Sequence, residues 1–310
     1  MLFRKIVSLV TAAIFFCTFS GVGFAETPDT VQDKLILIET DTYGQAQTGA
    51  VMDRISKLEM NYNGKNNTGS MMSRVDSLYD EIYNNDAGPS VLAQLNSIEW
   101  NISHEVSLDP VQDRLAEMEM LIDGKTNDGT FYQRIVSLSK SSFGTATLPL
   151  VKTLVPANTL VRIALVTPVN AKNLKVGDTI KYKVASDVVV DGKLVFAKGE
   201  PGEGHVTKVT QARNFGRNAE VNIDFEYVKS IDGTNVNTFV GEEAKQEMTN
   251  LAMAAGASLA GIVLLGPVGI IAGAFVKGKN IDLPEGTEAF IQTHDDTMLY
   301  GVETTLAAEE

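Results

Sequence analysis

A period of 20 residues runs through positions 31–144 and restricts that part of the chain to a repeat architecture. Three apolar positions recur in each copy at spacings i, i+4 and i+7, which places them in one narrow stripe along a helix. In the first copy these residues are Val31, Leu35 and Ile38. The sequence therefore predicts six short helices of about 12 residues each, joined by loops of about 8 residues.

Turn residues separate the stripes at a constant position, where a helix end would place a residue with positive φ. The residues at that position are Gly44, Gly64, Asn84, Gly124 and Gly144. The fourth copy departs most from the pattern, because it has His104 there. Its helix is predicted to be longer, over 90–105, and the lone Trp100 is expected to pack in this copy.

A helix with one narrow apolar stripe is not stable by itself. We expect the stripes to pack on one another, on a second chain or on the C-terminal part of the protein. The pattern RLxxLE, followed by YG or FG and then GS, resembles short repeats of exported proteins from bacteria with an outer membrane. That resemblance implies no known activity, so a spacer or oligomerisation element is favoured, and binding to a wall or envelope polymer is the alternative.

The residue pattern changes after Gly144, where we expect a linker over 145–158 followed by strands. Alternation of apolar and polar residues predicts strands because side chains along a strand point to opposite faces in turn. Asp191-Gly192 and Asp232-Gly233 are strong hairpin signals. The predicted strands are 160–165, 179–190, 193–197, 204–212, 219–230, 236–240, 288–294 and 298–302. These strands predict a closed or nearly closed barrel, or a sandwich.

Several motifs in this part resemble the β-barrel domain of TrbI/VirB10-type envelope proteins and its uncharacterised relatives. They are Val155-Pro156-Ala157-Asn158-Thr159, Val176-Gly177-Asp178, DVVVDGKLVFAKGEPGEGHV at 187–206, and Phe215-Gly216-Arg217. The resemblance covers 155–302 and implies a barrel that forms a ring at the outer membrane, with an inserted apolar segment lining the pore. The chain has no proline-rich spacer, so we expect a stand-alone envelope protein and not a member of a secretion machine.

Residues 251–276 carry no charged side chain. A single helix of this length would extend about 39 Å, enough to cross a hydrocarbon core of about 30 Å. Gly266-Pro267 would kink or break such a helix. A kinked span, a hairpin of two shorter arms, and a buried core helix followed by a strand all remain open. The residues predicted to serve membrane contact or assembly are Ala252, Gly256, Gly261, Gly266, Pro267, Gly269 and Gly273.

The N-terminus has the pattern of an export signal. Arg4 and Lys5 precede an apolar stretch over 6–19, and Gly23-Phe24-Ala25 offers a cleavage site. We favour cleavage after Ala25, with retention as an anchor as the alternative. Cleavage removes Cys17, the only cysteine, and leaves 24 basic and 39 acidic side chains, a formal charge of −15. So acidic a chain is not expected to bind nucleic acid.

The sequence shows no catalytic, cofactor or metal constellation. His104, His205 and His294 lie in different predicted elements without metal-ligand spacing. Asp295-Asp296 is predicted to form the turn between the last two strands. Arg213 and Arg217 form the compact basic cluster of the β-rich part. They could contact a lipid headgroup or an acidic repeat helix, and a solvated loop is the alternative.

These patterns predict an α+β multidomain chain with N-terminal short-helix repeats and a C-terminal all-β barrel or sandwich that contains an inserted apolar, glycine-rich helical segment. The predicted boundaries are a signal peptide at 1–25, repeats at 26–144, a linker at 145–158, a barrel-like domain at 159–302 with its insertion at 251–276, and a tail at 303–310.

The expected function is that of a non-enzymatic, exported cell-envelope scaffold protein in the periplasm or at the outer membrane of a bacterium. Its expected partners are a membrane, most naturally the outer one, or further copies of itself. Other envelope proteins or a wall polymer are further candidates, and no cofactor is expected. The alternative is a soluble periplasmic binding module in which 251–276 is buried core.

Overall fold

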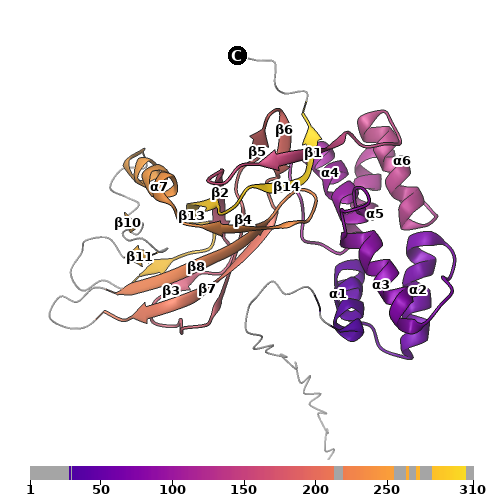
Figure 1. Ribbon diagram of the computed structural model, residues 1–310, viewed down its shortest axis with the longest axis horizontal. Helices are drawn as coiled ribbons and strands as arrows, with labels where there is room; N and C mark the ends of the chain where they lie inside the picture. Colours follow the sequence, from indigo (N-terminus) through magenta and orange to yellow (C-terminus); the bar gives the residue numbers. More distant parts are fainter. Residues whose placement is uncertain are drawn as a thin grey trace, which may run out of the picture.

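The computed structural model describes residues 28, 30–212, 219–254, 263–264, 270–272 and 281–304. The chain has an α+β fold, as predicted, with six repeat helices beside an antiparallel β region (Figure 1). The six helices follow the 20-residue period and each spans 13 residues. They are α1 (Val31–Tyr43), α2 (Val51–Asn63), α3 (Met71–Tyr83), α4 (Val91–Ser103), α5 (Val111–Asp123) and α6 (Phe131–Phe143).

The helix ends largely match the sequence pattern. The glycines at 44, 64, 124 and 144 adopt the left-handed conformation that ends a helix, with φ between 69° and 81°. His104 takes the same conformation with φ of 53°, so α4 ends at Ser103 and the prediction of a longer helix over 90–105 was wrong. Asn84 has φ of −88°, so positive φ was wrongly predicted there.

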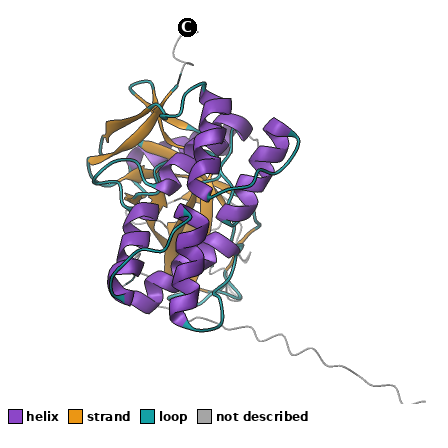
Figure 2. Cartoon of the chain, turned by 90° about the vertical axis from the view of Figure 1, so that its right-hand side faces the viewer, coloured by secondary structure: helices purple, strands orange, loops and turns teal. Residues whose placement is uncertain are grey.

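The apolar stripes pack against one another and form the core of a compact helical array (Figure 2). The second and third residues of the stripe are buried in all six copies, from Leu35 and Ile38 to Ile135 and Leu138. The first residue of the stripe is buried in the last three copies, whereas Met71, the first residue in the third copy, is 44% exposed. Of the three packing arrangements expected, stripe against stripe is the main one.

A buried ion pair joins consecutive helices of the array. In each pair, a glutamate near the middle of one helix accepts hydrogen bonds from an arginine 15 residues later. The glutamate also accepts the backbone N–H eight residues after it, so it orders the connecting loop as well. The pairs are Glu39–Arg54, Glu59–Arg74, Glu99–Arg114 and Glu119–Arg134.

Six antiparallel strands form a closed barrel in the order β8-β7-β4-β2-β13-β9, and β9 pairs back to β8. These strands are β2 (Leu160–Leu165), β4 (Thr179–Val184), β7 (Pro201–Thr210), β8 (Glu220–Lys229), β9 (Asn235–Phe239) and β13 (Glu288–Thr293). Alternate side chains such as Val161, Ile163 and Leu165 point into the barrel core, as the sequence alternation predicts.

A smaller sheet in the order β1-β14-β6-β5 lies beside the barrel. Its strands are β1 (Leu150–Val155), β5 (Val188–Val190), β6 (Lys193–Phe196) and β14 (Thr297–Glu303). Where a linker is expected over 145–158, the chain contributes β1 to this sheet. The single strand expected over 179–190 was wrong, because β4 belongs to the barrel and β5 to the smaller sheet. A further short pair joins β3 (Val169–Asn170) to β12 (Asp282–Leu283).

The apolar stretch 251–276 begins in α7 (Glu242–Ala254). It continues with two short antiparallel strands, β10 (Val263–Leu264) and β11 (Ile270–Ala272), and β11 extends the barrel sheet by pairing with β8. A single kinked helix over 251–276, one of the three alternatives left open by the sequence, is therefore wrong, because strand backbone interrupts it. Within the described ranges, no helix combines the length and the apolar character that crossing a membrane requires.

We expect Glu59→Ala to destabilise the protein by about 3 kcal/mol, because it leaves the buried Arg74 guanidinium without its carboxylate. Asp76→Ala is the control, since it breaks the more exposed Lys34–Asp76 pair and should cost less than about 1 kcal/mol. Urea unfolding followed by circular dichroism measures both free energies. Equal losses for the two variants would contradict the structural importance of the buried pair.

Candidate functional site

The outer face of α4 docks on the β region and forms the junction between the two parts of the molecule (Figure 1). Asn96 Nδ2 donates to the carbonyl oxygen of Ile231 at 3.1 Å and to Glu200 Oε1 at 3.0 Å. Trp100 Nε1 donates to Asp187 Oδ2 at 2.8 Å. These contacts join residues at least 87 positions apart, so the junction is a tertiary feature of the fold.

An apolar cluster fills the space around these polar contacts. It contains Trp100 and Val106 from the helical side and buried residues from the β region. The β-side members are Leu194, Ala197, Ile231 and Val302. Because each of these side chains has 5% or less of its surface exposed, separating the two parts would expose a continuous apolar surface.

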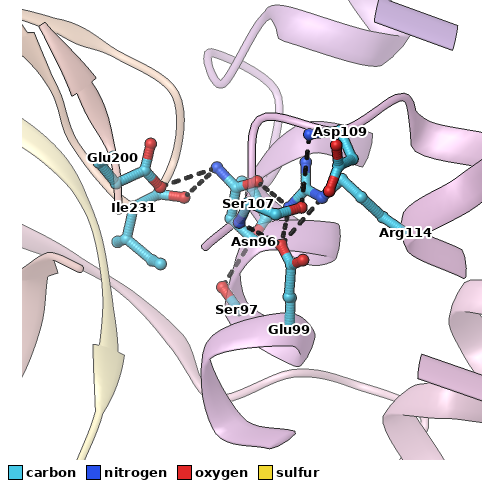
Figure 3. A network of polar contacts seen from close by, with 9 residues as sticks. Asn96, Ser97, Glu99, Ser107, Asp109, Arg114, Glu200 and Ile231 are labelled. Atoms are coloured by element: carbon cyan, nitrogen blue, oxygen red, sulfur yellow. Dashed lines mark hydrogen bonds and ion pairs between the residues drawn. The ribbon is translucent and has the colours of Figure 1, made fainter. Parts of the chain in front are cut away.

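The repeat ion pair continues into the junction (Figure 3). Arg114 pairs with Glu99, and its Nη2 also donates to Asn96 Oδ1 at 2.7 Å. Asn96 then uses its amide nitrogen to hold Glu200 on the β side. One connected network therefore runs from the α4–α5 ion pair to the start of β7.

Two glycines allow close approach at the junction, Gly199 to the backbone of the helical side and Gly233 to a side chain of α4. A Cβ at Gly199 would lie 2.0 Å from the carbonyl oxygen of Val106, and one at Gly233 would lie 2.8 Å from Leu92 Cδ2. The N–H of Val106 donates to the carbonyl oxygen of Lys198 at 2.8 Å beside this contact. Glu105 adds salt bridges to Lys183 and Lys198 at the rim.

Glu200 is the buried ionisable group at the centre of the junction. Burial raises the pKa of its carboxyl from 4.5 to about 8, and Arg114 and Lys229 only partly oppose that rise. The nearby carboxylates of Glu99 and Asp232 add to it. Glu200 is therefore mostly protonated at neutral pH, which lets it be buried without a direct cationic partner.

A cavity of about 450 Å³ lies between α1, the α4–α5 loop and the barrel. Glu200, Lys229, Arg114 and Asp41 contribute polar groups to its wall. Burial raises the pKa of Asp41, although the Tyr83 hydroxyl, which donates to it at 2.8 Å, opposes the rise. The cavity has the size of a small-molecule site.

The residues considered for chemistry in the sequence lie apart from this junction or act structurally. His205 contacts Glu226 on the neighbouring strand at 2.8 Å, and His294 follows β13. His104 ends α4 and stacks edge-on against Trp100. Among the described residues, no group of three His, Cys, Asp or Glu side chains could hold a metal ion. Asp295-Asp296 forms the predicted turn between β13 and β14.

The residues predicted to serve membrane contact and assembly fall largely outside the described part of the chain. Arg213 and Arg217 lie outside it, as do Gly256, Gly261, Gly266, Pro267, Gly269 and Gly273. Only the backbone of Ala252 is described, in α7. Their roles stay predictions.

Sequence reasoning missed the junction residues Asn96, Asp187, Gly199 and Glu200 as a group. A signal was present in the fourth repeat, which is unusual in having Trp100 and His104. These departures fall on the helix that docks on the β region, so they mark an interface and not a longer helix.

The search against protein-family models finds no match, and neither does the search of curated proteins. Among solved structures, ComB10 of the Com type IV secretion system of Helicobacter pylori aligns with 46% of this chain and 88% of its own length. The identity is 14% and the TM-score is 0.25. A likeness at that score carries no argument about function, and the TrbI/VirB10 resemblance stays a prediction.

We expect Gly199→Ala to loosen the junction, because the added methyl group meets the Val106 carbonyl oxygen. Gly177→Ala is the matched control, since Gly177 has a similar φ of +91°, compared with +95°, but open space around it. The clash should lower the free energy of unfolding of Gly199→Ala by about 2 kcal/mol more than Gly177→Ala lowers it. Trp100, the only tryptophan, reports the opening as a red shift of its fluorescence in Gly199→Ala alone. Unchanged emission would contradict the close packing at Gly199.

We expect the stability of the protein to fall as the pH rises from about 4.5 to about 8. A carboxyl whose pKa is higher in the folded state binds more protons when folded, so deprotonation favours unfolding over that interval. The Glu200 contribution should approach about 1.4 kcal/mol per pH unit.

Denaturant unfolding across this pH range checks the Glu200 contribution. Glu200→Gln should flatten the slope and make the protein more stable than wild type at pH 8. Glu117→Gln, on the exposed face of α5, controls for removing one negative charge. Parallel pH curves for wild type and Glu200→Gln would show that Glu200 is not the group responsible.

Proposed function

We propose that this chain is a non-enzymatic, exported structural protein of a bacterial cell envelope. In this proposal the helical array and the barrel act as one rigid unit. The observation that carries it is the junction at α4, where hydrogen bonds, an apolar cluster and two glycine contacts fix the array against the β region. A protein built this way transmits position and orientation between its two ends.

The chemistry of the junction also fits a structural role. Glu200 and Asp41 have raised pKa values, which in some proteins indicate catalytic groups. Here Glu200 is held by Asn96 and Asp41 by Tyr83. Burial accounts for both shifts, so packing explains them without a reaction.

The glycine-rich stretch 251–276 is the part that we propose contacts a membrane or further copies of the chain. Its position supports this proposal, because the stretch begins in α7, after the barrel strand β9, and returns to the barrel sheet at β11, which pairs with β8. In the sequence, Arg213 and Arg217 lie between β7 and β8, and β8 is the strand that pairs with β11. They would supply positive charge to lipid headgroups.

A second candidate is a soluble periplasmic binding module, which the junction cavity of about 450 Å³ favours. Its wall mixes cationic and acidic groups with apolar side chains such as Leu92 and Val111. In this alternative, 251–276 packs as protein core.

Cell fractionation distinguishes the two candidates. We expect the protein in the membrane pellet, resistant to high salt and carbonate and released by mild detergent. Replacing Gly256, Gly261 and Gly273 together with leucine should reduce membrane association or assembly, because small residues allow close backbone packing. The helical array should stay folded, as measured by Trp100 fluorescence.

Release of the wild-type protein by salt, or its recovery in the soluble periplasmic fraction, would favour the binding module. Unchanged membrane association and assembly in the leucine variant would remove the glycine-rich stretch from the mechanism.

A further inference from the structure

The outer face of α2 repeats the pattern of the α4 face that docks on the barrel. Met52, Ser56 and Met60 occupy the repeat positions that Leu92, Asn96 and Trp100 occupy in α4. In both helices these positions are spaced by four residues, so they form one line along the helix. On α4, this line is covered by the β region.

The polar residue at the centre of the line is held in the same way in both helices. Arg74 Nη2 donates to Ser56 Oγ at 3.0 Å, and Arg114 Nη2 donates to Asn96 Oδ1 at 2.7 Å. In each case the arginine also pairs with the glutamate of the helix before it. The α2 face is thus built on the same ion-pair support as a face known to dock.

Nothing in the described part of the chain covers the α2 line. Met52 is 44% exposed and Met60 is 47% exposed. Figure 1 places α2 at the end of the array away from the barrel, and its helix neighbours are α3 and α6. Methionine is an adaptable apolar side chain that suits a contact surface.

The pattern on α2 is complementary to itself. Exposed Asp53 and Lys57 lie four residues apart on one flank of this line, so that flank carries an acidic and a basic side chain next to the apolar and small residues of the line. In an antiparallel pair related by a two-fold axis at Ser56, Met52 meets Met60 of the other copy. Asp53 then lies beside Lys57 of that copy, and the small Ser56 allows the helices to approach closely.

We propose that the Met52–Ser56–Met60 face of α2 is an isologous contact between two copies of this chain. No other helix of the array has this arrangement. The same positions in α5 are Gln112, Ala116 and Met120, flanked by the like charges Asp113 and Glu117. Two α5 faces would therefore repel each other at the flanks, whereas two α2 faces attract.

Disulfide formation at the two-fold axis tests the contact in the full chain with Cys17→Ala. Ser56→Cys should give a covalent dimer under mild oxidation at micromolar concentration. Ala116→Cys, at the same repeat position in α5, should give at least tenfold less. Adding Met60→Lys to Ser56→Cys should abolish the dimer. Equal cross-linking at 56 and 116, or none at 56, would overturn the proposal.

Sedimentation equilibrium provides a second test that does not alter Ser56. Met60→Lys should weaken self-association at least tenfold, and Met120→Lys, with a side chain 52% exposed in wild type, should leave it unchanged. Wild-type protein that stays monomeric at 100 µM would also overturn the proposal. The contact does not use 251–276, so a soluble protein that dimerises through α2 would support it while contradicting membrane contact.

Discussion

A carboxylate from one helix paired with a guanidinium from the next is the interaction on which the array and its junction depend. Each 13-residue helix is too short to be stable alone, and its apolar stripe is narrow. The buried pair fixes the next helix at a set distance, and the same glutamate fixes the loop between them. Since a buried charge is tolerated only when paired, this geometry also disfavours other packings of the stripes.

The third repeat shows how this interaction can be replaced. Tyr79 stands where α1, α2, α4 and α5 have glutamate, and Gln94 stands where the next helix would have arginine. Both partners change together, so no buried charge is left unpaired. Tyr79 instead lies under Lys34, which pairs with Asp76. The contact between α3 and α4 is thus made without a buried ion pair, directly before the helix that docks on the barrel.

Local patterns predicted the parts of the fold that depend on local physics. The stripe residues Leu35 and Ile38 follow from helix periodicity, and Asp191-Gly192 forms a hairpin because both residues adopt positive φ. The break between β4 and β5 could not be predicted in the same way. Asp187, which lies between the two strands, accepts hydrogen bonds from Lys198 and Trp100, which are 11 and 87 positions away. The Asn96–Glu200 contact could not be predicted either, because its two residues are 104 positions apart in the sequence.

The fourth repeat departs from the repeat pattern and the second repeat keeps it, so the array has two different ends, one at α4 and one at α2. At α4, Asn96 and Trp100 engage the β region, and Gly199 leaves no room between the backbones. The array cannot turn relative to the barrel without exposing the apolar cluster around Ile231. Any contact made at α2 therefore sets the orientation of the barrel as well. Because α2 lies at the opposite end of the molecule, a contact between two α2 helices leaves β8 and β11 uncovered (Figure 1).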